Sequence, residues 1–209
     1  MENRSKEFRT VSYDVWKRNI EKSISIYSKL IDYYIFDEIY TFTLELYDRL
    51  NSGGKLIMFG NGGSAADCDH IVGEFRNRFL IDRKPVMAMS LANSISTITA
   101  IGNDFSYDEI FSRQLTAICS KNDSVIALST SGTSRNITKA FNELHDNKEL
   151  YKSVDSLLIS GVIVLDTHVK RHIEIPIGPS KYTVARIQEA TMFVLHMMCF
   201  FYDSMSETK

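Results

Sequence analysis

The sequence contains few of the residues that mark several specialised classes of protein, notably proline and cysteine. Its 209 residues include three prolines and three cysteines, the latter at positions 68, 119 and 199. An odd number of cysteines far apart in the chain does not predict a disulfide framework, and it suits a reducing compartment. The charged first residues are not followed by an apolar run, so we expect no signal peptide and a cytoplasmic protein.

Charge of one sign is not in excess either. The 24 lysines and arginines nearly balance the 26 aspartates and glutamates, which gives a formal net charge of -2. Because nucleic-acid binding depends on clustered Lys and Arg, we expect no nucleic-acid partner, and any anion must be bound by local chemistry. The apolar segment 190–202 is shorter than the roughly 20 residues that span a bilayer. We therefore expect no membrane partner, and a buried helix inside the domain or at a subunit interface.

The residues that are present predict a single α/β domain over positions 1–209. Apolar residues at helical spacing predict a pair of helices within residues 1–52, the first with a stripe formed by Trp16, Ile20, Ile24, Tyr27, Leu30 and Ile31. Short apolar runs typical of strands follow at 55–59, 86–89, 124–128, 156–160, 162–165 and 173–176. Helical spacing recurs over 108–118, after 135 and over 183–203. This alternation predicts a three-layer, doubly wound, mostly parallel sheet in residues 53–209, with a C-terminal helix.

The first of two unusual loops follows the strand predicted at 55–59. In an open parallel sheet, ligands collect at the carboxyl ends of the strands. The loop consists of Gly60, Asn61, Gly62, Gly63 and Ser64, whose small side chains would let backbone N–H groups approach a ligand at the start of the next helix. A tight turn without a ligand is the ordinary alternative. The loop lacks the Lys-Ser/Thr ending of nucleotide-binding phosphate loops.

The second loop supplies five hydroxyl groups around Gly132, ahead of a helix that begins near residue 135: Ser129, Thr130, Ser131, Thr133 and Ser134. Hydroxyls, exposed amides and a helix dipole together make a phosphate site without lysine. A helix cap is the alternative interpretation, but a cap needs only one hydroxyl. Five hydroxyls favour phosphate binding.

A third group combines imidazole, carboxylate and carboxamide side chains. His70 and Glu74 are four residues apart, on one face of the helix that the glycine loop opens. This spacing suits two ligands of one metal ion, or a carboxylate oriented by an imidazole, although surface His–Glu pairs are common. In the final helix, Gln188 and His196 are separated by eight residues, or about 12 Å of rise. They could reach one atom only by stretching toward each other or by coming from different subunits.

Other polar residues give weaker signals. Asn103 and Asp104 follow the apolar segment 95–101, and they could form a turn or contact sugar hydroxyls. We expect His145, His168 and His172 to face solvent, and we assign them no role.

These motifs together resemble the sugar isomerase (SIS) domain superfamily and, within it, the sedoheptulose 7-phosphate isomerases, also called phosphoheptose isomerases. The resemblance spans most of the chain and rests on ordered motifs at 59–67, 70, 74, 100–104, 111–114, 129–132, 186–189 and 196. It implies the three-layer SIS fold and a homotetramer with active sites at subunit interfaces. It also implies isomerisation of sedoheptulose 7-phosphate to D-glycero-D-manno-heptose 7-phosphate, for bacterial heptose biosynthesis in lipopolysaccharide or capsule.

The resemblance implies a role for each matching residue. The phosphate would be held by Ser129, Thr130, Ser131 and Ser134. The sugar would contact Asn61, Gly62, Gly63, Ser64, Glu74, Asn103, Asp104 and Gln188. Zinc would be bound by His70, Glu74, Gln188 and His196. In an isomerisation through an enediol, we expect Glu74 to act as the base and His196 as the acid, with zinc polarising the carbonyl or holding the sugar hydroxyls.

Two other functions are compatible with the same fold. A relative of the replication-initiation regulators would bind the initiator protein, but the presence of all four potential zinc ligands argues against this function. An isomerase or sensor for another sugar phosphate would share the hydroxyl loop, and it would bind a phosphosugar without turning over the heptulose.

Overall fold

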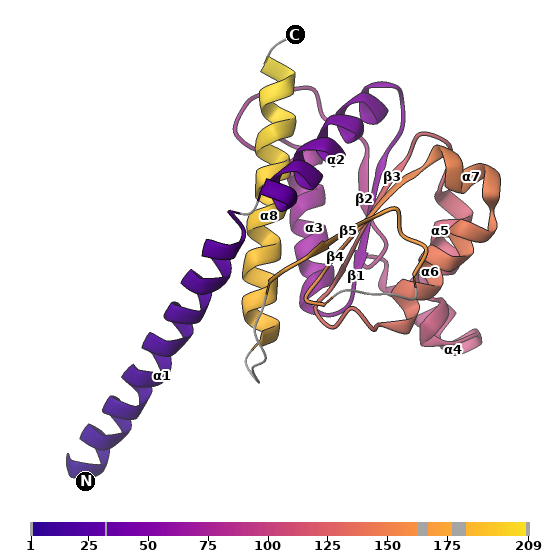
Figure 1. Ribbon diagram of the computed structural model, residues 1–209. Helices are drawn as coiled ribbons and strands as arrows, with labels where there is room; N and C mark the ends of the chain where they lie inside the picture. Colours follow the sequence, from indigo (N-terminus) through magenta and orange to yellow (C-terminus); the bar gives the residue numbers. More distant parts are fainter. Residues whose placement is uncertain (1, 32, 163–166, 177–182, 208–209) are drawn as a thin grey trace.

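The computed structural model describes residues 2–31, 33–162, 167–176 and 183–207. Five parallel strands form one sheet in the order β2-β1-β3-β4-β5 (Figure 1). Their bounds are Leu56–Gly60 for β1, Ala88–Ser90 for β2, Ser124–Ser129 for β3, Asp155–Ser160 for β4 and Arg171–Glu174 for β5. The apolar run predicted at 162–165 lies almost entirely outside the described residues.

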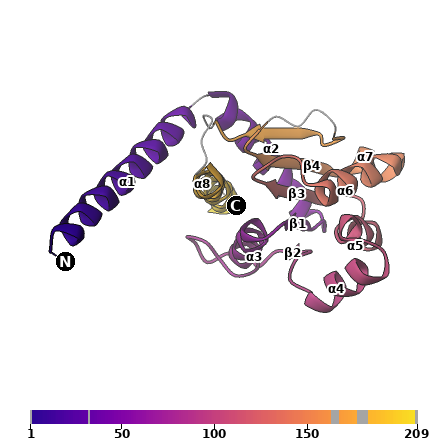
Figure 2. The ribbon, with the colours of Figure 1, turned by 90° about the horizontal axis from the view of Figure 1, so that it is seen from below.

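Both faces of the sheet are covered by helices, as Figure 2 shows. Successive strand residues point to opposite faces, so Leu56 and Met58 join one buried cluster while Ile57 and Phe59 join the other. The first cluster contains residues of α2 (Tyr33–Asn51), α3 (Gly63–Arg76) and α8 (Thr183–Glu207). The second contains residues of α5 (Ser112–Ile118) and α6 (Arg135–Asp146), with α4 (Ile95–Asp104) and α7 (Lys148–Ser153) packed against it. The predicted three-layer α/β architecture is confirmed.

The carboxyl ends of β1 and β3 lie side by side, because these two strands are neighbours in the parallel sheet. The chain continues from β1 to β2 through α3 on one face, and from β3 to β4 through α6 and α7 on the other. These two connections lead in opposite directions along the sheet, so the carboxyl ends of β1 and β3 border a topological switch point. The glycine loop follows β1 and the hydroxyl loop follows β3. Both loops therefore lie where ligands bind in open α/β sheets.

Two predicted elements differ from those in the structure. The strand expected at 86–89 is Ala88–Ser90 instead, because the backbone N–H of Val86 bonds to the carbonyl of Phe75 at the end of α3 rather than to β1. The helix expected at 108–118 is divided into the 3-10 helix η1 (Tyr107–Glu109) and α5. The Ser112 hydroxyl bonds back to the Glu109 carbonyl and carboxylate across the break.

The N-terminal helical pair is confirmed, but α1 (Glu2–Lys29) projects away from the body of the protein in Figures 1 and 2. Much of its predicted apolar stripe faces solvent, since Trp16 is 60% and Ile24 is 59% exposed. The helix contacts α8 near its own C-terminal end. There, the Tyr27 ring packs edge-on against Phe193 and its hydroxyl donates to the Glu189 carbonyl.

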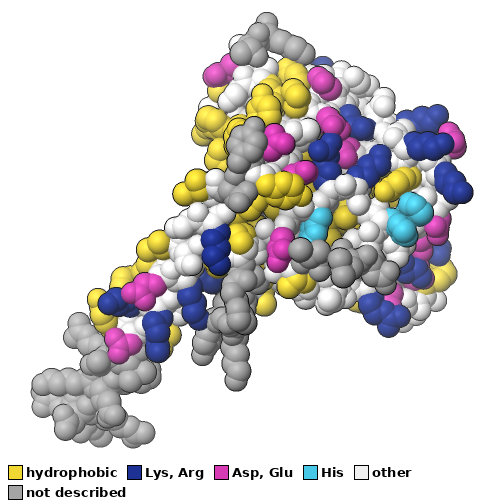
Figure 3. Space-filling view, viewed as in Figure 1, with side chains coloured by type: hydrophobic (Ala, Val, Ile, Leu, Met, Phe, Trp, Pro, Cys, Tyr) yellow, Lys and Arg dark blue, Asp and Glu magenta, His cyan; other side chains and the backbone are white. Residues whose placement is uncertain are grey.

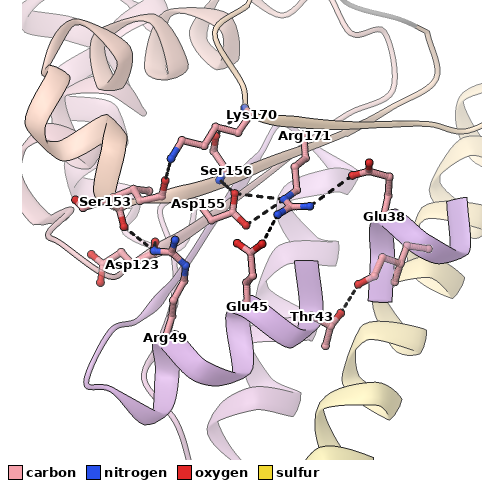
Figure 4. A network of polar contacts seen from close by, with 12 residues as sticks. Glu38, Thr43, Glu45, Arg49, Asp123, Ser153, Asp155, Ser156, Lys170 and Arg171 are labelled. Carbon is pink, nitrogen blue, oxygen red and sulfur yellow. Dashed lines mark hydrogen bonds and ion pairs between the residues drawn. The ribbon is translucent and has the colours of Figure 1, made fainter. Parts of the chain in front are cut away.

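A network of charged residues fixes the opposite end of the sheet, where β4 and β5 begin (Figure 4). The Arg171 guanidinium bonds to Asp155 at 3.2 Å and to Glu45 of α2 at 2.5 Å, and it lies 3.8 Å from Glu38. Burial raises the pKa of Asp155, while Arg171 opposes this rise. The network ties the edge strand β5 to the helix that covers it.

None of the described helices has both the length and the apolar character that crossing a bilayer requires. The apolar segment of α8 is instead buried on one face and exposed on another. Its Leu195 and Cys199 are fully buried in the core, whereas Phe193 and Phe200 are 45% and 43% exposed. The segment is thus a core helix with one apolar face left at the surface.

Candidate active site

The glycine loop brings the start of α3 against α8. Gly62 and Gly63 are exposed, whereas Ser64 is buried beneath the loop and packs against Gly60. A β-carbon on Gly63 would lie only 2.1 Å from Nε2 of Gln188. The carboxamide of Gln188 therefore rests directly on the backbone of Gly63, an approach that only glycine allows.

The hydroxyl loop is shaped by its own side chains. Ser129 Oγ accepts a hydrogen bond from the N–H of Gly132 at 3.0 Å, and Ser131 Oγ accepts one from the N–H of Thr133 at 3.2 Å. Gly132 has a φ of 68°, which favours glycine at this tight turn. Within the described part of the chain, the Ser134 side chain does not cap α6, although Ser134 is the N-cap residue. Its hydroxyl instead lies 3.4 Å from Ser129 Oγ, so both hydroxyls stand at a helix N-terminus, where anions bind.

The two loops are joined by an asparagine pair. Asn61 of the glycine loop exchanges two hydrogen bonds with Asn136 in the first turn of α6. The Tyr107 hydroxyl donates to the same Asn61 side chain at 3.0 Å. Neither Asn136 nor Tyr107 was expected to have a role, because Asn61 and Asn136 are 75 positions apart and no local pattern signals their contact.

The structure brings three of the predicted site residues together between α3 and α8. Nε2 of His70 lies 3.3 Å from Oε1 of Glu74 and 3.4 Å from Nε2 of His196. Phe79 stacks on the His196 ring, with the centroids 5.5 Å apart and the planes at 13°. The pKa of His196 is lowered by burial and by His70, while Glu74 opposes this shift. These contacts place the Glu74 carboxylate and the His196 imidazole against the same ring nitrogen of His70.

Asp67 is a further polar residue of this region. It precedes His70 by three residues on α3, and with Gln188 and His196 it lines a hollow between α3 and α8. Burial raises the pKa of its carboxyl group, and its Oδ2 is a buried atom without a hydrogen-bond partner among the described residues. Asp67 ends the motif at 59–67, and no role was expected for it. Its spacing of three from His70 would have indicated a shared helix face.

Other predicted residues lie apart from this group. Asn103 and Asp104 form the last turn of α4, where both are exposed and bond to each other. Gln188 contacts Gly63 rather than His70, because α3 and α8 run in the same direction and Gln188 is two turns before His196. Thr130 lies after β3 with its carbonyl against Gly161.

The expectation that three histidines face solvent is wrong for two of them. His172 is half-buried in β5, and its Nε2 lies 2.7 Å from the Ser160 hydroxyl. His145 is partly buried because it stacks on the exposed His168, with ring centroids 3.8 Å apart. Pairing of β5 with β4 accounts for the burial of His172.

The donor atoms near His70 are of the kinds that zinc binds. Two ligands bound to a tetrahedral zinc ion at about 2.1 Å lie about 3.4 Å from each other, which is the separation of His70 from both Glu74 and His196. Among the described residues, however, no group of three or more His, Cys, Asp or Glu side chains is already placed around one ion position. The donor atoms are thus of the types that zinc binds, and the His70–Glu74 and His70–His196 distances match the separation of two zinc ligands.

Comparison with known proteins identifies the family. The SIS domain family model matches residues 27–148. The chain is 41% identical over 160 residues to the probable phosphoheptose isomerase of Thermoplasma volcanium, which covers 77% of this chain and 78% of the relative. Solved phosphoheptose isomerases from Neisseria gonorrhoeae and Francisella tularensis match with TM-scores of 0.75 and 0.77, at 27% and 26% identity, each over 92% of this chain and 98% of theirs. The chain therefore belongs to the SIS domain family and, within it, to the phosphoheptose isomerases.

Proposed function

We propose that this protein interconverts sedoheptulose 7-phosphate and D-glycero-D-manno-heptose 7-phosphate through an enediol, in the cytoplasm, for bacterial heptose biosynthesis. The observation that carries the proposal is the meeting of Glu74 and His196 at Nε2 of His70, on the helix that begins at the glycine loop. Family membership supports the same reaction.

In the proposed reaction, one end of the site binds the phosphate and the other end binds the sugar. Ser129, Thr130, Ser131 and Ser134 would hold the phosphate through hydroxyls and the N-terminus of α6. The sugar would then extend past Asn61, Gly63 and Gln188 toward α3, with Asn103 and Asp104 as further contacts.

The Glu74 carboxylate would remove a proton from C1 of the ketose and return it to C2, which converts the ketone to the aldehyde through the enediol. The His196 imidazole would exchange protons with the oxygens on C1 and C2. Imidazole suits this role because its ordinary pKa, about 6.5, lies close to neutral pH. Burial and His70 lower the pKa of His196 from that value.

We also propose that His70, Glu74, Gln188 and His196 hold a zinc ion. When bound, zinc would supply a Lewis acid that polarises the carbonyl oxygen. The spacing of His70 from its two neighbours supports this proposal. Added zinc should raise the melting temperature of the parent protein but not that of His70→Gln, since ligands that bind the folded state stabilise it. An equal shift for both proteins would remove the zinc proposal.

A homotetramer with active sites at subunit interfaces is the assembly that we propose. The apolar residues along α1, visible as yellow patches in Figure 3, support burial of this helix against another copy of the chain. Light scattering on the purified protein should give four times the mass of one chain, and the mass of a single chain would refute the assembly.

The activity is tested by incubating the protein with sedoheptulose 7-phosphate, with and without a chelator, and detecting the aldose. Glu74→Gln should lower kcat by at least about 100-fold, because general-base catalysis contributes 10²–10⁴-fold. Glu149→Gln is the matched control, since Glu149 is an exposed side chain of α7. No aldose from the parent protein would end the proposal, whereas product insensitive to the chelator would count against zinc alone.

A further inference from the structure

Three polar side chains from separate elements meet beside the carboxyl ends of β1 and β3. Asn61 directly follows β1, Tyr107 belongs to η1, and Asn136 lies in the first turn of α6. Asn136 is 2% exposed, whereas Tyr107 is 58% exposed. The group links the glycine loop to the helix that begins at the hydroxyl loop.

The hydrogen bonds within this group occupy both acceptor positions of the Asn61 carboxamide oxygen. Asn61 Oδ1 accepts from Asn136 Nδ2 at 2.8 Å and from the Tyr107 hydroxyl at 3.0 Å. Asn61 Nδ2 donates to Asn136 Oδ1 at 3.0 Å. A carboxamide oxygen has two lone pairs and its nitrogen has two hydrogens. The oxygen of Asn61 is therefore fully occupied, and one of its N–H groups has no partner among the described residues.

We propose that Asn136 and Tyr107 are positioning residues that hold Asn61 with its remaining N–H directed to an oxygen of the bound sugar. Turning the Asn61 amide alone would oppose its N–H groups to those of Asn136, so the pair resists that turn. The inference rests on the proposed function, which places the sugar against Asn61. An acceptor at this position of the ligand, such as a carbonyl oxygen or a hydroxyl lone pair, satisfies the N–H. A ligand group that can only donate leaves it unpaired, which is costly in a buried site.

A double-mutant cycle on Tyr107 and Asn61 tests this role. Tyr107→Phe removes one hydrogen bond and keeps the exposed ring, so it should lower kcat/KM about 3- to 10-fold, the usual effect of one hydrogen bond. In an Asn61→Ala background the same change should alter kcat/KM less than twofold, because its effect passes through Asn61. Asn136→Asp sets a carboxylate oxygen against Asn61 Oδ1, and it should cost at least about tenfold.

Two controls separate positioning from damage to the fold. The inhibition constant of inorganic phosphate should stay within twofold in Tyr107→Phe, since the hydroxyl loop does not contact Tyr107 in the proposed arrangement. Glu149→Gln, at the exposed side chain of α7, should leave kcat/KM unchanged. An active parent in which Tyr107→Phe keeps its full effect without Asn61 would overturn this inference alone. A parent that does not turn over the heptulose phosphate would remove the proposed function, and this inference with it.

Discussion

Replacing Gly63 by alanine should separate activity from stability. The new β-carbon would lie 2.1 Å from Nε2, 3.1 Å from Cδ and 3.4 Å from Oε1 of Gln188. These atoms belong to the far end of a flexible side chain, so Gln188 should swing away while the backbone stays in place. Gly63 is the first residue of α3, and alanine is favoured over glycine inside helices by about 0.5–1 kcal/mol. We therefore expect no more than about 1 kcal/mol of change in the free energy of unfolding.

The Gly63→Ala substitution should instead lower kcat/KM. Displacing one polar side chain from a substrate contact removes about 1–3 kcal/mol, which corresponds to roughly 5- to 150-fold in kcat/KM. Gly73→Ala is the matched control in the same helix, because its β-carbon would meet no atom within 4 Å. It should raise the melting temperature by about 2–4 °C and leave kcat/KM unchanged. Parent-like activity of Gly63→Ala, measured beside Gln188→Ala, would refute the placement of Gln188 at the sugar.

Two further predictions concern stability. Arg83→Met removes the cation that faces the buried Asp203 carboxylate, since the pair is 2.7 Å apart with side chains 5% and 3% exposed, and it should cost about 3–5 kcal/mol in urea unfolding. Adding Asp203→Asn removes the buried charge and keeps an acceptor for the backbone N–H groups of Leu80 and Ile81, so it should recover most of this loss, and a double variant no more stable than the single one would contradict the argument. Burial lowers the pKa of His172, partly opposed by Glu174, so the unfolded chain binds the proton more readily and stability falls as pH drops below about 6.5. His172→Gln should flatten the decline between pH 7.5 and 5.5, and an unchanged slope in urea unfolding would show that His172 has no part in it.

The sequence was sufficient for features that depend on local pattern. Five-residue apolar runs such as 55–59 predicted strands buried on both faces, and the glycines and hydroxyls after two of them predicted the loops at the switch point. The spacing of His70 and Glu74 predicted their shared helix face, and their 3.3 Å separation agrees with it. Such features can be predicted because each depends on residues within one short segment of the sequence.

Contacts between distant segments could not be predicted in this way. Phe79 stacks on His196, and Asn61 pairs with Asn136, only because the strand order and the packing of α8 bring these residues together. The division of the helix predicted at 108–118 likewise depends on Glu109, whose carboxylate is held both by Ser112 and by Lys139 of α6. A periodic pattern within one segment carries no information about the partner that a side chain will find.

The parallel course of α3 and α8 determines how the site can work. Gly63 and His70 are separated by about 10.5 Å of helix rise, and Gln188 and His196 by about 12 Å, so the two contacts between these helices fall nearly in register. Gln188 consequently meets the glycine loop while His196 meets His70 and Glu74. In the proposed reaction, one chain would thus offer the Gln188 carboxamide to the sugar near the loops, and Glu74 and His196 for proton transfer farther along the two helices. For Gln188 also to bind the same ion as His196, its side chain must leave Gly63, or a neighbouring copy of the chain must supply it.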